Sequence, residues 1–552
     1  MKKRTLSLFL ATALTFGLIA CGSSETTTTS TEATESTESA SSESSESVDA
    51  ESVSTGISFP LEESVTITIT GRKFDSYVDF EETEFFQQIE EDTNVHIEWT
   101  SLSTSSFDES FGLMMAADNM PDALYGIYLM SGSKLVEYAD QGYFMQLNQY
   151  MDAGLMPNLS YIYESRPAMA ASNTAPDGYY YHIPMVNEWY NDIESNVAMM
   201  INTEWLDAID MDMPSTTDEL YEVLKAFDEA GDLNGNGMDD EIPMSFVYDS
   251  VIQGWGGVTG WFGTATAAGQ PVIIDGELVM AEATEDYKDA MIYLNKLYSE
   301  GLLDQEIFTL DTTSYQARNN VAPYSVGVIA DWNEEVIDGA EGTTYEYLPV
   351  LTSDNGSTPT WLTTDTNYTA IGFVMSSKTE HGEVIAAWID NILSKENQLA
   401  SFFGYPEFLE EIEDGAYMEA VKEDGSAYSK SERSWYSPAN GGLYIMLMPE
   451  YYTYYEETSY NQNKFESFDY YGAYTYPDGA YNNSWLATTE ESSELAILTT
   501  DIDSYLDIMA ASFVSQGNIE EQWDSYLAQL ETLGLSRMLE IKQGIYDRNK
   551  VE

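Results

Sequence analysis

The stretch Val65-Thr66-Ile67-Thr68-Ile69-Thr70 alternates with a period of two and carries β-branched residues on both faces, which predicts a strand. A helix is predicted at residues 85–89, and a second strand at residues 95–99. The apolar run at residues 111–116 predicts another helix. Strands that alternate with helices in this way pair in parallel, with helices on the faces of the sheet. The fold class indicated is therefore α/β.

The helix after Pro214 has the clearest start signal in the chain. Thr216 and Glu219 match a capping box, in which each side chain bonds the backbone N–H of the other residue. The apolar residues that follow fall on one helical stripe: Leu220, Val223, Leu224 and Phe227. Other helices are expected near residues 286–300, 383–393 and 504–533.

The loop after this helix resembles the first half of an EF-hand calcium loop. It reads Asp232-Leu233-Asn234-Gly235-Asn236-Gly237-Met238-Asp239-Asp240-Glu241. Oxygen-bearing side chains occupy positions 1, 3 and 5, Gly occupies position 6, and position 7 supplies a backbone carbonyl. The expected calcium ligands are Asp232, Asn234, Asn236, Met238 through its carbonyl, Asp240 and Glu241.

The second half of the loop departs from the EF-hand pattern. Pro243 stands at position 12, where an EF-hand has a bidentate Glu, so Asp240 and Glu241 would have to complete the coordination. A strand is predicted directly afterwards, over residues 242–248. The all-oxygen set favours Ca²⁺ in a structural role, and the alternative is a plain Asn-Gly turn between helix and strand.

Composition restricts the partners of the chain. The 552 residues include 95 Asp and Glu but only 21 Lys and Arg, for a net charge of −74. Such a surface excludes nucleic acid as a partner and disfavours strongly anionic polymers. The three histidines are scattered, and no catalytic motif occurs in a fitting context.

The N-terminus predicts export and lipid attachment. Lys2, Lys3 and Arg4 precede an apolar run that ends in Leu18-Ile19-Ala20-Cys21. This order is typical of a signal peptide, at residues 1–20, and resembles a bacterial lipobox in which Cys21 is acylated. An ordinary signal peptide with a chance Cys is the alternative. Residues 21–60 then form the lipidated Cys and a disordered tether rich in Ser, Thr and Glu.

Several separated segments give the chain a family resemblance. Met200-Ile201-Asn202-Thr203-Glu204-Trp205-Leu206-Asp207, the segment from Met213 to Leu220 and the calcium loop resemble bacterial extracellular solute-binding proteins of family 1. Further matches follow the same order along the chain: Met115-Ala116-Ala117-Asp118-Asn119-Met120-Pro121-Asp122, Gly301-Leu302-Leu303-Asp304, Gly327-Val328-Ile329-Ala330-Asp331-Trp332, Ile371-Gly372-Phe373-Val374-Met375 and Leu533-Gly534-Leu535. These proteins are the sugar-binding components of ABC importers, and the similar branch is the large calcium-loop lipoproteins of Gram-positive bacteria.

The resemblance implies a two-lobed, periplasmic-binding-protein-like fold of type II, with ligand in the cleft between the lobes. Lobe 1 would comprise residues 61–185 and 362–405, and lobe 2 residues 186–361 and 406–552. The lobes would close on the ligand by a hinge motion. The implied protein is a monomer on the outer face of a bacterial cell membrane, with a permease as partner and Ca²⁺ as a structural cofactor.

Sugar binding needs aromatic platforms beside hydrogen-bonding side chains. The residues expected to supply them lie after the first strand, in the loops that would face the cleft, and at the presumed crossings: Arg72, Tyr125, Tyr128, Trp189, Tyr190, Trp255, Trp261, Asp331, Trp332, Asn333 and Trp361. The alternative for each is ordinary packing. The segment 451–481 is dense in Tyr, which suits sugar contact, although a loop-rich edge packed on the second lobe is the favoured interpretation.

The function predicted is capture of a carbohydrate, a neutral oligosaccharide by the charge argument, and its delivery to an ABC permease. The chain is not expected to be an enzyme. The competing readings are a secreted glycoside hydrolase, which needs paired carboxylates on a cleft, and a surface adhesin that holds glycans without handing them on. A peptide or an amino sugar remains open as the ligand.

Overall fold

The computed structural model describes residues 56–550 apart from 189–192, 196–197, 249, 251–253, 267–268, 320–321, 332–343, 362, 366–367, 369, 405, 414–415, 423–427, 439–440, 448–452, 455–469, 477–480 and 483–484. The chain divides into two units, residues 1–54 and 55–552, and every described element belongs to the second. Cys21, with the predicted signal peptide, lies outside the described residues. Among the helices that are described, none is long and apolar enough to cross a membrane.

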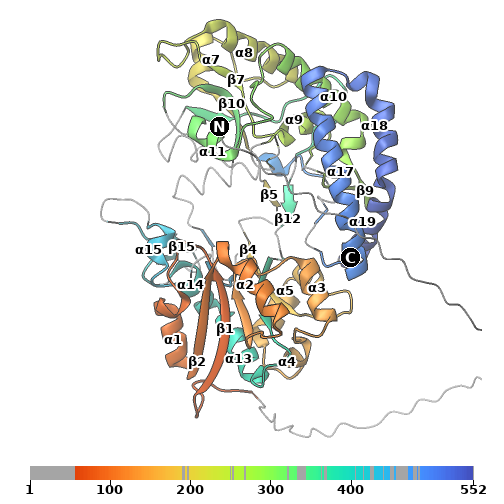
Figure 1. Cartoon of the computed structure of the whole chain (residues 1–552). Helices are drawn as coiled ribbons and strands as arrows, with labels where there is room; N and C mark the ends of the chain where they lie inside the picture. The colour runs from red at the N-terminus through yellow and green to blue at the C-terminus, as the bar shows by residue number, and fades with distance from the viewer. Residues whose placement is uncertain are drawn as a thin grey trace, which may run out of the picture. The chain divides into compact units, whose positions relative to one another are not determined.

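The first lobe is built on a six-stranded mixed sheet (Figure 1). Its strands lie in the order β16 (Ile445–Met446), β4 (His182–Asn187), β13 (Ala370–Met375), β3 (Ala123–Gly126), β1 (Val65–Lys73) and β2 (Val95–Ser103). β1 is parallel to β2 and to β3, whereas β13 is antiparallel to both of its neighbours. The parallel strand–helix–strand unit predicted from residues 65–99 is therefore confirmed.

Helices cover both faces of this sheet, because successive side chains of a strand point to opposite sides. Leu124 and Val374 face a core that contains Phe107 of α2. Their neighbours Tyr125 and Phe373 face the other core, which contains residues of α1, α5, α13 and α14. The helical segments of the lobe are η1 (Phe80–Glu82), α1 (Glu84–Thr93), α2 (Thr104–Ala116), α3 (Gly132–Asp140), α4 (Asn148–Asp152), α5 (Pro157–Ser165), α6 (Pro167–Asn173), α13 (Gly382–Ile392) and α14 (Lys395–Phe403).

The second lobe has its own four-stranded sheet and its own core. The strands lie in the order β11 (Tyr345–Tyr347), β6 (Ala198–Asn202), β10 (Val326–Asp331) and β7 (Ile242–Met244). β7 is shorter than the strand predicted over residues 242–248. Helical segments and a small hairpin surround this sheet: α7 (Thr203–Ile209), α8 (Thr217–Ala230), α9 (Gly256–Trp261), β8 (Val272–Ile274), β9 (Glu277–Val279), η2 (Ala281–Ala283), α10 (Glu285–Ser299) and α11 (Thr312–Asn319).

The start of α8 confirms the predicted capping box. The Glu219 backbone N–H donates to Thr216 Oγ1 at 3.1 Å, and the Thr216 N–H donates to Glu219 Oε2 at 3.2 Å. Leu220, Val223 and Phe227 are buried in the core of the second lobe, as the apolar stripe predicts.

Two chain segments cross between the lobes as a short ladder. β5 (Ile193–Ser195) leads from the first sheet to β6, and it pairs antiparallel with β12 (Thr363–Asp365), which leads back to β13. The boundaries expected at residues 186 and 362 lie beside these crossings. The boundary expected at residue 406 is wrong, because β16 and the buried residues Leu443 and Leu447 belong to the first lobe.

A small extension separates α14 from β16 in the chain. It comprises β14 (Leu409–Glu413), β15 (Ala416–Glu419) and α15 (Lys430–Arg433), and β17 (Thr453–Tyr454) completes its three-stranded sheet.

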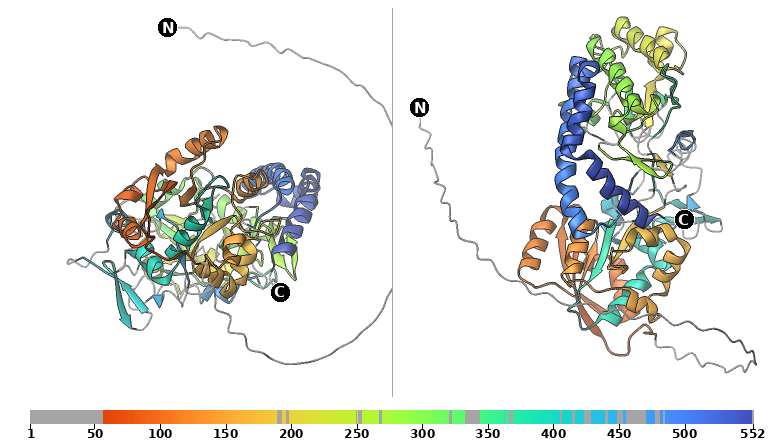
Figure 2. Two further views of the ribbon diagram at one scale, coloured as in Figure 1. Left: turned by 90° about the horizontal axis from the view of Figure 1, so that it is seen from below. Right: turned by 90° about the vertical axis from the view of Figure 1, so that its right-hand side faces the viewer.

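Three C-terminal helices, α17 (Thr489–Gln516), α18 (Ile519–Leu533) and α19 (Leu535–Asn549), pack side by side (Figure 2). The single helix expected near residues 504–533 is wrong, because Gly517 adopts φ +65° and ends α17 there. A second capping box, between Thr488 and Glu491, starts α17.

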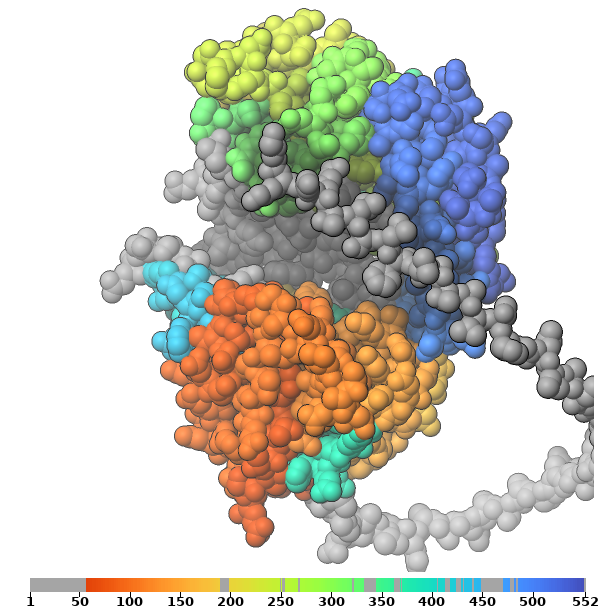
Figure 3. Space-filling view, in the orientation of Figure 1, coloured from red at the N-terminus to blue at the C-terminus, as the bar shows by residue number. Residues whose placement is uncertain are grey.

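The helix α17 contacts both lobes. Thr489 Oγ1 donates to Asp140 Oδ2 of α3 at 2.9 Å, and Asn295 Nδ2 of α10 donates to the Val514 carbonyl at 2.7 Å. In Figure 3 the blue surface of these helices meets the gold surface of the first lobe, where α17 touches α3 and α19 touches α6.

Candidate functional site

The loop that follows α8 is held together by hydrogen bonds within its own residues. Its side-chain oxygens accept hydrogen bonds from the backbone of the same loop: Gly237 N–H donates to Asp232 Oδ2 at 3.0 Å, and Met238 N–H donates to Asn236 Oδ1 at 2.7 Å. Gly235 and Gly237 take φ of +71° and +83°, conformations that favour glycine. The repeated side-chain-to-backbone bonds hold the loop in a compact turn.

The exit of the loop closes through the two acidic residues that the sequence nominates. Glu241 accepts the Asn234 N–H at 3.0 Å and the Asp240 N–H at 3.1 Å. Asp240 Oδ1 accepts from Asn236 Nδ2 at 3.0 Å. These bonds bring residues from both ends of the loop together, and the side chains there carry the carboxylate and amide oxygens that a hard cation such as Ca²⁺ prefers.

Two of the expected calcium ligands, Asn234 and Asn236, are asparagines. Among the residues that the structure describes, no group of three or more His, Cys, Asp or Glu side chains is placed to hold a metal ion. A cation in this loop would therefore depend on the amide oxygens of Asn234 and Asn236 as well as on the carboxylates.

Five of the residues expected to contact sugar lie in the protein interior, which contradicts that expectation for this structure. Tyr125 is completely buried, and its ring packs on those of Phe80 and Phe86, each with centroids 5.4 Å apart. Trp361 stacks on Tyr471 with centroids 4.3 Å apart. A ring whose faces are covered by other rings offers no platform to a ligand. The five buried residues are Tyr125, Trp255, Trp261, Asp331 and Trp361.

Four further expected residues, Trp189, Tyr190, Trp332 and Asn333, lie outside the described residues. Arg72 and Tyr128 are described, and the structure brings them together. The Arg72 guanidinium donates to the Tyr128 carbonyl and lies 5.3 Å from the centroid of the Phe107 ring. Tyr128 takes φ +42°, and its side chain is 56% exposed. Arg72 therefore braces a loop whose tip presents the Tyr128 ring.

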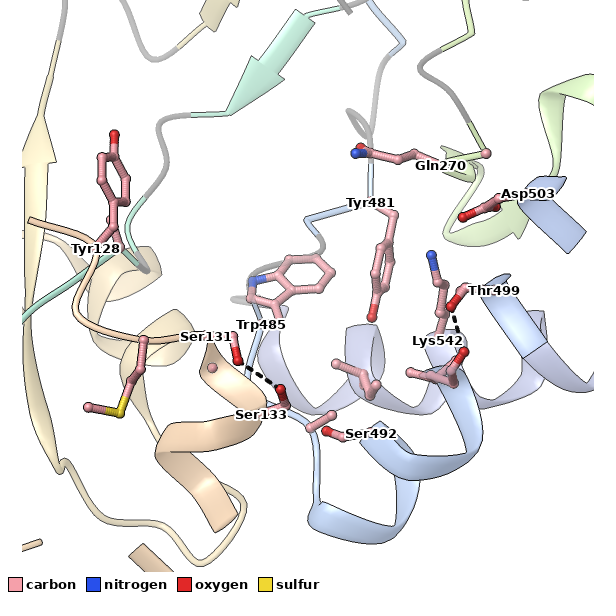
Figure 4. Close-up of a pocket in the computed structure, with 17 residues that line it drawn as sticks. Tyr128, Ser131, Ser133, Gln270, Tyr481, Trp485, Ser492, Thr499, Asp503 and Lys542 are labelled. Atoms are coloured by element: carbon pink, nitrogen blue, oxygen red, sulfur yellow. Dashed lines mark hydrogen bonds between the residues drawn. The ribbon is translucent and has the colours of Figure 1, made fainter. Parts of the chain in front are cut away.

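Tyr128 borders a pocket of about 660 Å³ (Figure 4). Residues 128–133 and Ala370 contribute from the first lobe, and residues of the β8 region, α17 and α19 contribute from the other side. The lining residues are Tyr128, Met130, Ser131, Gly132, Ser133, Gly269, Gln270, Ala370, Tyr481, Trp485, Ala487, Ser492, Leu495, Thr499, Asp503, Lys542 and Ile545. Of the residues nominated from the sequence as ligand contacts, only Tyr128 is among them.

The pocket combines aromatic rings with small hydroxyl side chains. Tyr481 and Trp485 pack edge to face with centroids 5.3 Å apart, and Trp485 Nε1 donates to Ser172 Oγ at 3.2 Å. Ser131 and Ser133 lie 3.0 Å apart at the start of α3 (Figure 4). Rings that present flat apolar faces beside hydroxyl groups suit the C–H faces and hydroxyls of a sugar.

One side of the pocket carries charges in a poorly hydrated setting. Lys542 is 4% exposed, and burial lowers its pKa to about 8, although Asp503 and Glu282 oppose this effect. Burial raises the pKa of Asp503, and the negative charge of Asp507 adds to the rise. Behind them, burial raises the pKa of Glu282 to about 7. These three groups form the charged cluster of the pocket, defined as Glu282, Asp503 and Lys542.

Most of these pocket residues carry no signal that sequence reasoning could have used. Tyr481 belongs to the Tyr-rich segment for which sugar contact was one interpretation. Asp503 is one of 95 acidic residues, and nothing local distinguishes it. Lys542 stands out only because Lys and Arg are scarce in this chain.

Comparison with known proteins assigns the chain to a family. The model of the bacterial extracellular solute-binding protein family matches residues 78–399, which is more than half of the chain. The chain therefore belongs to this family, and its fold is the two-lobed type II fold of such binding proteins.

The relatives include a well-covered transport protein. The chain is 28% identical over 516 residues to the fructooligosaccharide ABC transporter substrate-binding protein FusA of Streptococcus pneumoniae serotype 4, over 89% of this chain and 92% of FusA. The structure of FusA in complex with kestose has a TM-score of 0.73 at 27% identity, over 88% of this chain and 99% of that one.

Two other comparisons show the breadth of the group. A human-milk-oligosaccharide (HMO) binding ABC-transporter associated protein of Bifidobacterium longum infantis shares the fold, with a TM-score of 0.75 at 22% identity over 89% of this chain and all of that one. The polygalacturonan/rhamnogalacturonan-binding protein YtcQ of Bacillus subtilis is 26% identical over 230 residues, which is 42% of this chain and 43% of YtcQ.

Proposed function

We propose that this chain is the substrate-binding component of an ABC importer and that it captures an oligosaccharide. The observation that carries the proposal is its likeness to FusA over almost the full length of both proteins. The pocket that Tyr128 borders supplies chemistry that suits this role, because rings and hydroxyl side chains line it together. The ligand therefore lies between the lobes, and their closure on it delivers it to a membrane permease.

The ligand contacts divide between the lobes. Tyr128 and the Ser131–Ser133 pair contribute from the first lobe, whereas Gln270 and Lys542 contribute from the second. A sugar chain that bonds both groups favours the closed arrangement, since a ligand shifts a conformational equilibrium by its differential affinity for the two states.

The calcium loop has a structural role in this proposal. Asp232, Asn234, Asn236, the Met238 carbonyl, Asp240 and Glu241 hold Ca²⁺, which ties the end of α8 to β7. A structure of FusA as an EF-hand mutant in complex with fructo-nystose supports a cation loop in this group of proteins. The ion contributes no chemistry to the ligand, because the loop belongs to a different part of the second lobe from the pocket residues.

Cys21 anchors the protein to the outer face of the membrane. Its two acyl chains give stable attachment where one is marginal, and the Ser, Thr and Glu segment up to residue 60 gives the binding domain reach. The protein then acts as a monomer beside its permease.

A thermal-shift screen with neutral oligosaccharides, kestose among them, tests the proposal on Ca²⁺-loaded protein. A ligand that binds the folded state raises the melting temperature by mass action. At least one glycan should do so, and it should also compact the protein in small-angle scattering. If no glycan raises the melting temperature, the proposal fails. A reducing-sugar assay on the same glycans should show no hydrolysis; release of sugar would favour the hydrolase reading, and binding without compaction would favour the adhesin.

A further inference from the structure

The charged cluster marks one end of the pocket as chemically different from the rest. Lys542 of α19 and Asp503 of α17 border the pocket, and Glu282 of η2 lies behind them. Figure 4 shows the Lys542 ammonium directed between the Tyr481 ring and Asp503. The ammonium lies 5.0 Å from the centroid of that ring, a cation–π contact.

Two buried carboxylate oxygens beside this end of the pocket lack a hydrogen-bond donor among the described residues. Asp503 Oδ1 and Glu282 Oε2 are buried and accept no hydrogen bond from the described residues. Only the other oxygen of Glu282 is bonded, by the Gly269 N–H at 3.1 Å. A buried carboxylate oxygen without a donor destabilises the folded protein by more than a typical hydrogen bond contributes.

Gly269 packs close to the Asp503 carboxylate. It takes φ +75°, and a Cβ at this position would collide with Asp503 Oδ1. The backbone therefore approaches the carboxylate closely but leaves Oδ1 without a hydrogen bond. The raised pKa values of Glu282 and Asp503 agree with this lack of donors. A carboxylate that accepts few hydrogen bonds in a buried place binds a proton more readily.

We propose that Asp503 and Lys542 form a donor-demanding subsite, which takes a hydroxyl-bearing, uncharged sugar ring and rejects a uronate. This inference rests on the proposed function and names the ligand class that the pocket selects. Sugar hydroxyls donate hydrogen bonds to Asp503 and accept them from Lys542, with the Tyr481 ring beside them. A uronate adds a carboxylate that offers acceptors only, and this carboxylate would meet the negative charges of Asp503 and Glu282 as well as the ammonium.

The selection matters because family members differ in the charge of their ligands. FusA is named for neutral fructooligosaccharides and YtcQ for polygalacturonan, a polyuronate. Like charges brought together in a poorly hydrated site oppose binding by several kcal/mol. The charged cluster thus discriminates by repulsion as well as by attraction.

Isothermal titration calorimetry at pH 7.5 tests the subsite on Ca²⁺-loaded protein. The probes are the neutral oligosaccharide that gives the largest thermal shift and a trigalacturonate of similar length. We expect the unmodified protein to bind the neutral glycan at least about a hundredfold more tightly than the uronate. Asp503→Asn keeps the shape of the side chain and adds a donor. It should lower the affinity for the neutral glycan about tenfold and reduce the affinity ratio of neutral glycan to uronate to about tenfold.

Asp501→Asn is the matched control, because Asp501 is exposed on the same helix and does not line the pocket. It removes one negative charge and should leave both affinities unchanged. Lys542→Met, checked for folding by its melting curve, should weaken the neutral glycan at least tenfold. The subsite is refuted if Asp503→Asn behaves like Asp501→Asn, or if the unmodified protein binds both probes equally. Either result leaves the proposed function standing, which fails only if no glycan binds at all.

Discussion

Replacing Glu282 by Gln should make the protein more stable at alkaline pH, against the usual effect of altering a buried residue. Glu282 is 5% exposed, and burial raises its pKa to about 7. The folded protein therefore holds the proton up to neutral pH, whereas the unfolded chain releases it near the ordinary glutamate pKa of 4.5. Because the folded state binds more protons in this window, the free energy of unfolding decreases as pH rises from about 4.5 to about 7.

The size of the effect follows from the two pKa values. A difference of about 2.5 between 7 and 4.5, at about 1.36 kcal/mol each, corresponds to about 3 kcal/mol lost above pH 7. Gln remains uncharged at every pH. Its carbonyl can keep the bond from Gly269 N–H, and its amide can donate to Asp503 Oδ1, which accepts no hydrogen bond from the described part of the native chain.

Urea denaturation at several pH values between 5 and 8 measures the effect. The advantage of Glu282→Gln over the native protein should grow by about 2 kcal/mol across this range. Glu277→Gln, on the exposed part of β9, is the control and should follow the native profile. If Glu282→Gln also runs parallel to the native protein, the carboxyl group is ionised at the same pH in both states, and the account of the charged cluster is wrong.

Three other perturbations follow from the structure. Chelation of Ca²⁺ should lower the melting temperature by several degrees, and Asp232→Ala should abolish that response; a melting curve indifferent to chelator would refute the calcium loop. Arg166→Met should lower the free energy of unfolding by about 3 kcal/mol, because Arg166 donates from Nε and Nη2 to the two oxygens of Glu188 at 2.7 and 3.0 Å, and Glu188 is only 4% exposed. Urea denaturation measures the loss, and a value under 1 kcal/mol would contradict this account. Tyr128→Ala should lower the affinity for the neutral glycan about tenfold in calorimetry without changing the melting temperature of the free protein. An unchanged affinity would show that Tyr128 does not contact the ligand.

The hydrogen-bonded turn after α8 and the helix starts could be predicted because their chemistry is local. The partners of Thr216 and of Asp232 lie within a few residues in the chain, so spacing alone predicts the hydrogen bonds found between them. Strand β1 is equally evident, since its alternation depends on its own residues.

The sugar platforms were harder to predict because burial is a property of the assembled fold. Trp261 and Trp361 occur in Gly-rich and polar surroundings that favour a loop, yet other segments cover both rings. Tyr125 lies on the face of its strand that α1 covers, and the choice of face follows from the register of β3. Conversely, Asp503 and Lys542 meet at the pocket from different helices, and no spacing in the sequence announces that meeting.

The helix α17 has a mechanical consequence for the two lobes. At about 1.5 Å per residue, the helix extends about 38 Å from Thr489, which contacts Asp140, to Val514, which contacts Asn295. A rotation of only 10° about the second contact would carry the first turn by about 7 Å, more than twice the 2.9 Å that joins Thr489 to Asp140. The helix acts as a lever, so a small change of angle between the lobes becomes an all-or-none break at its tip.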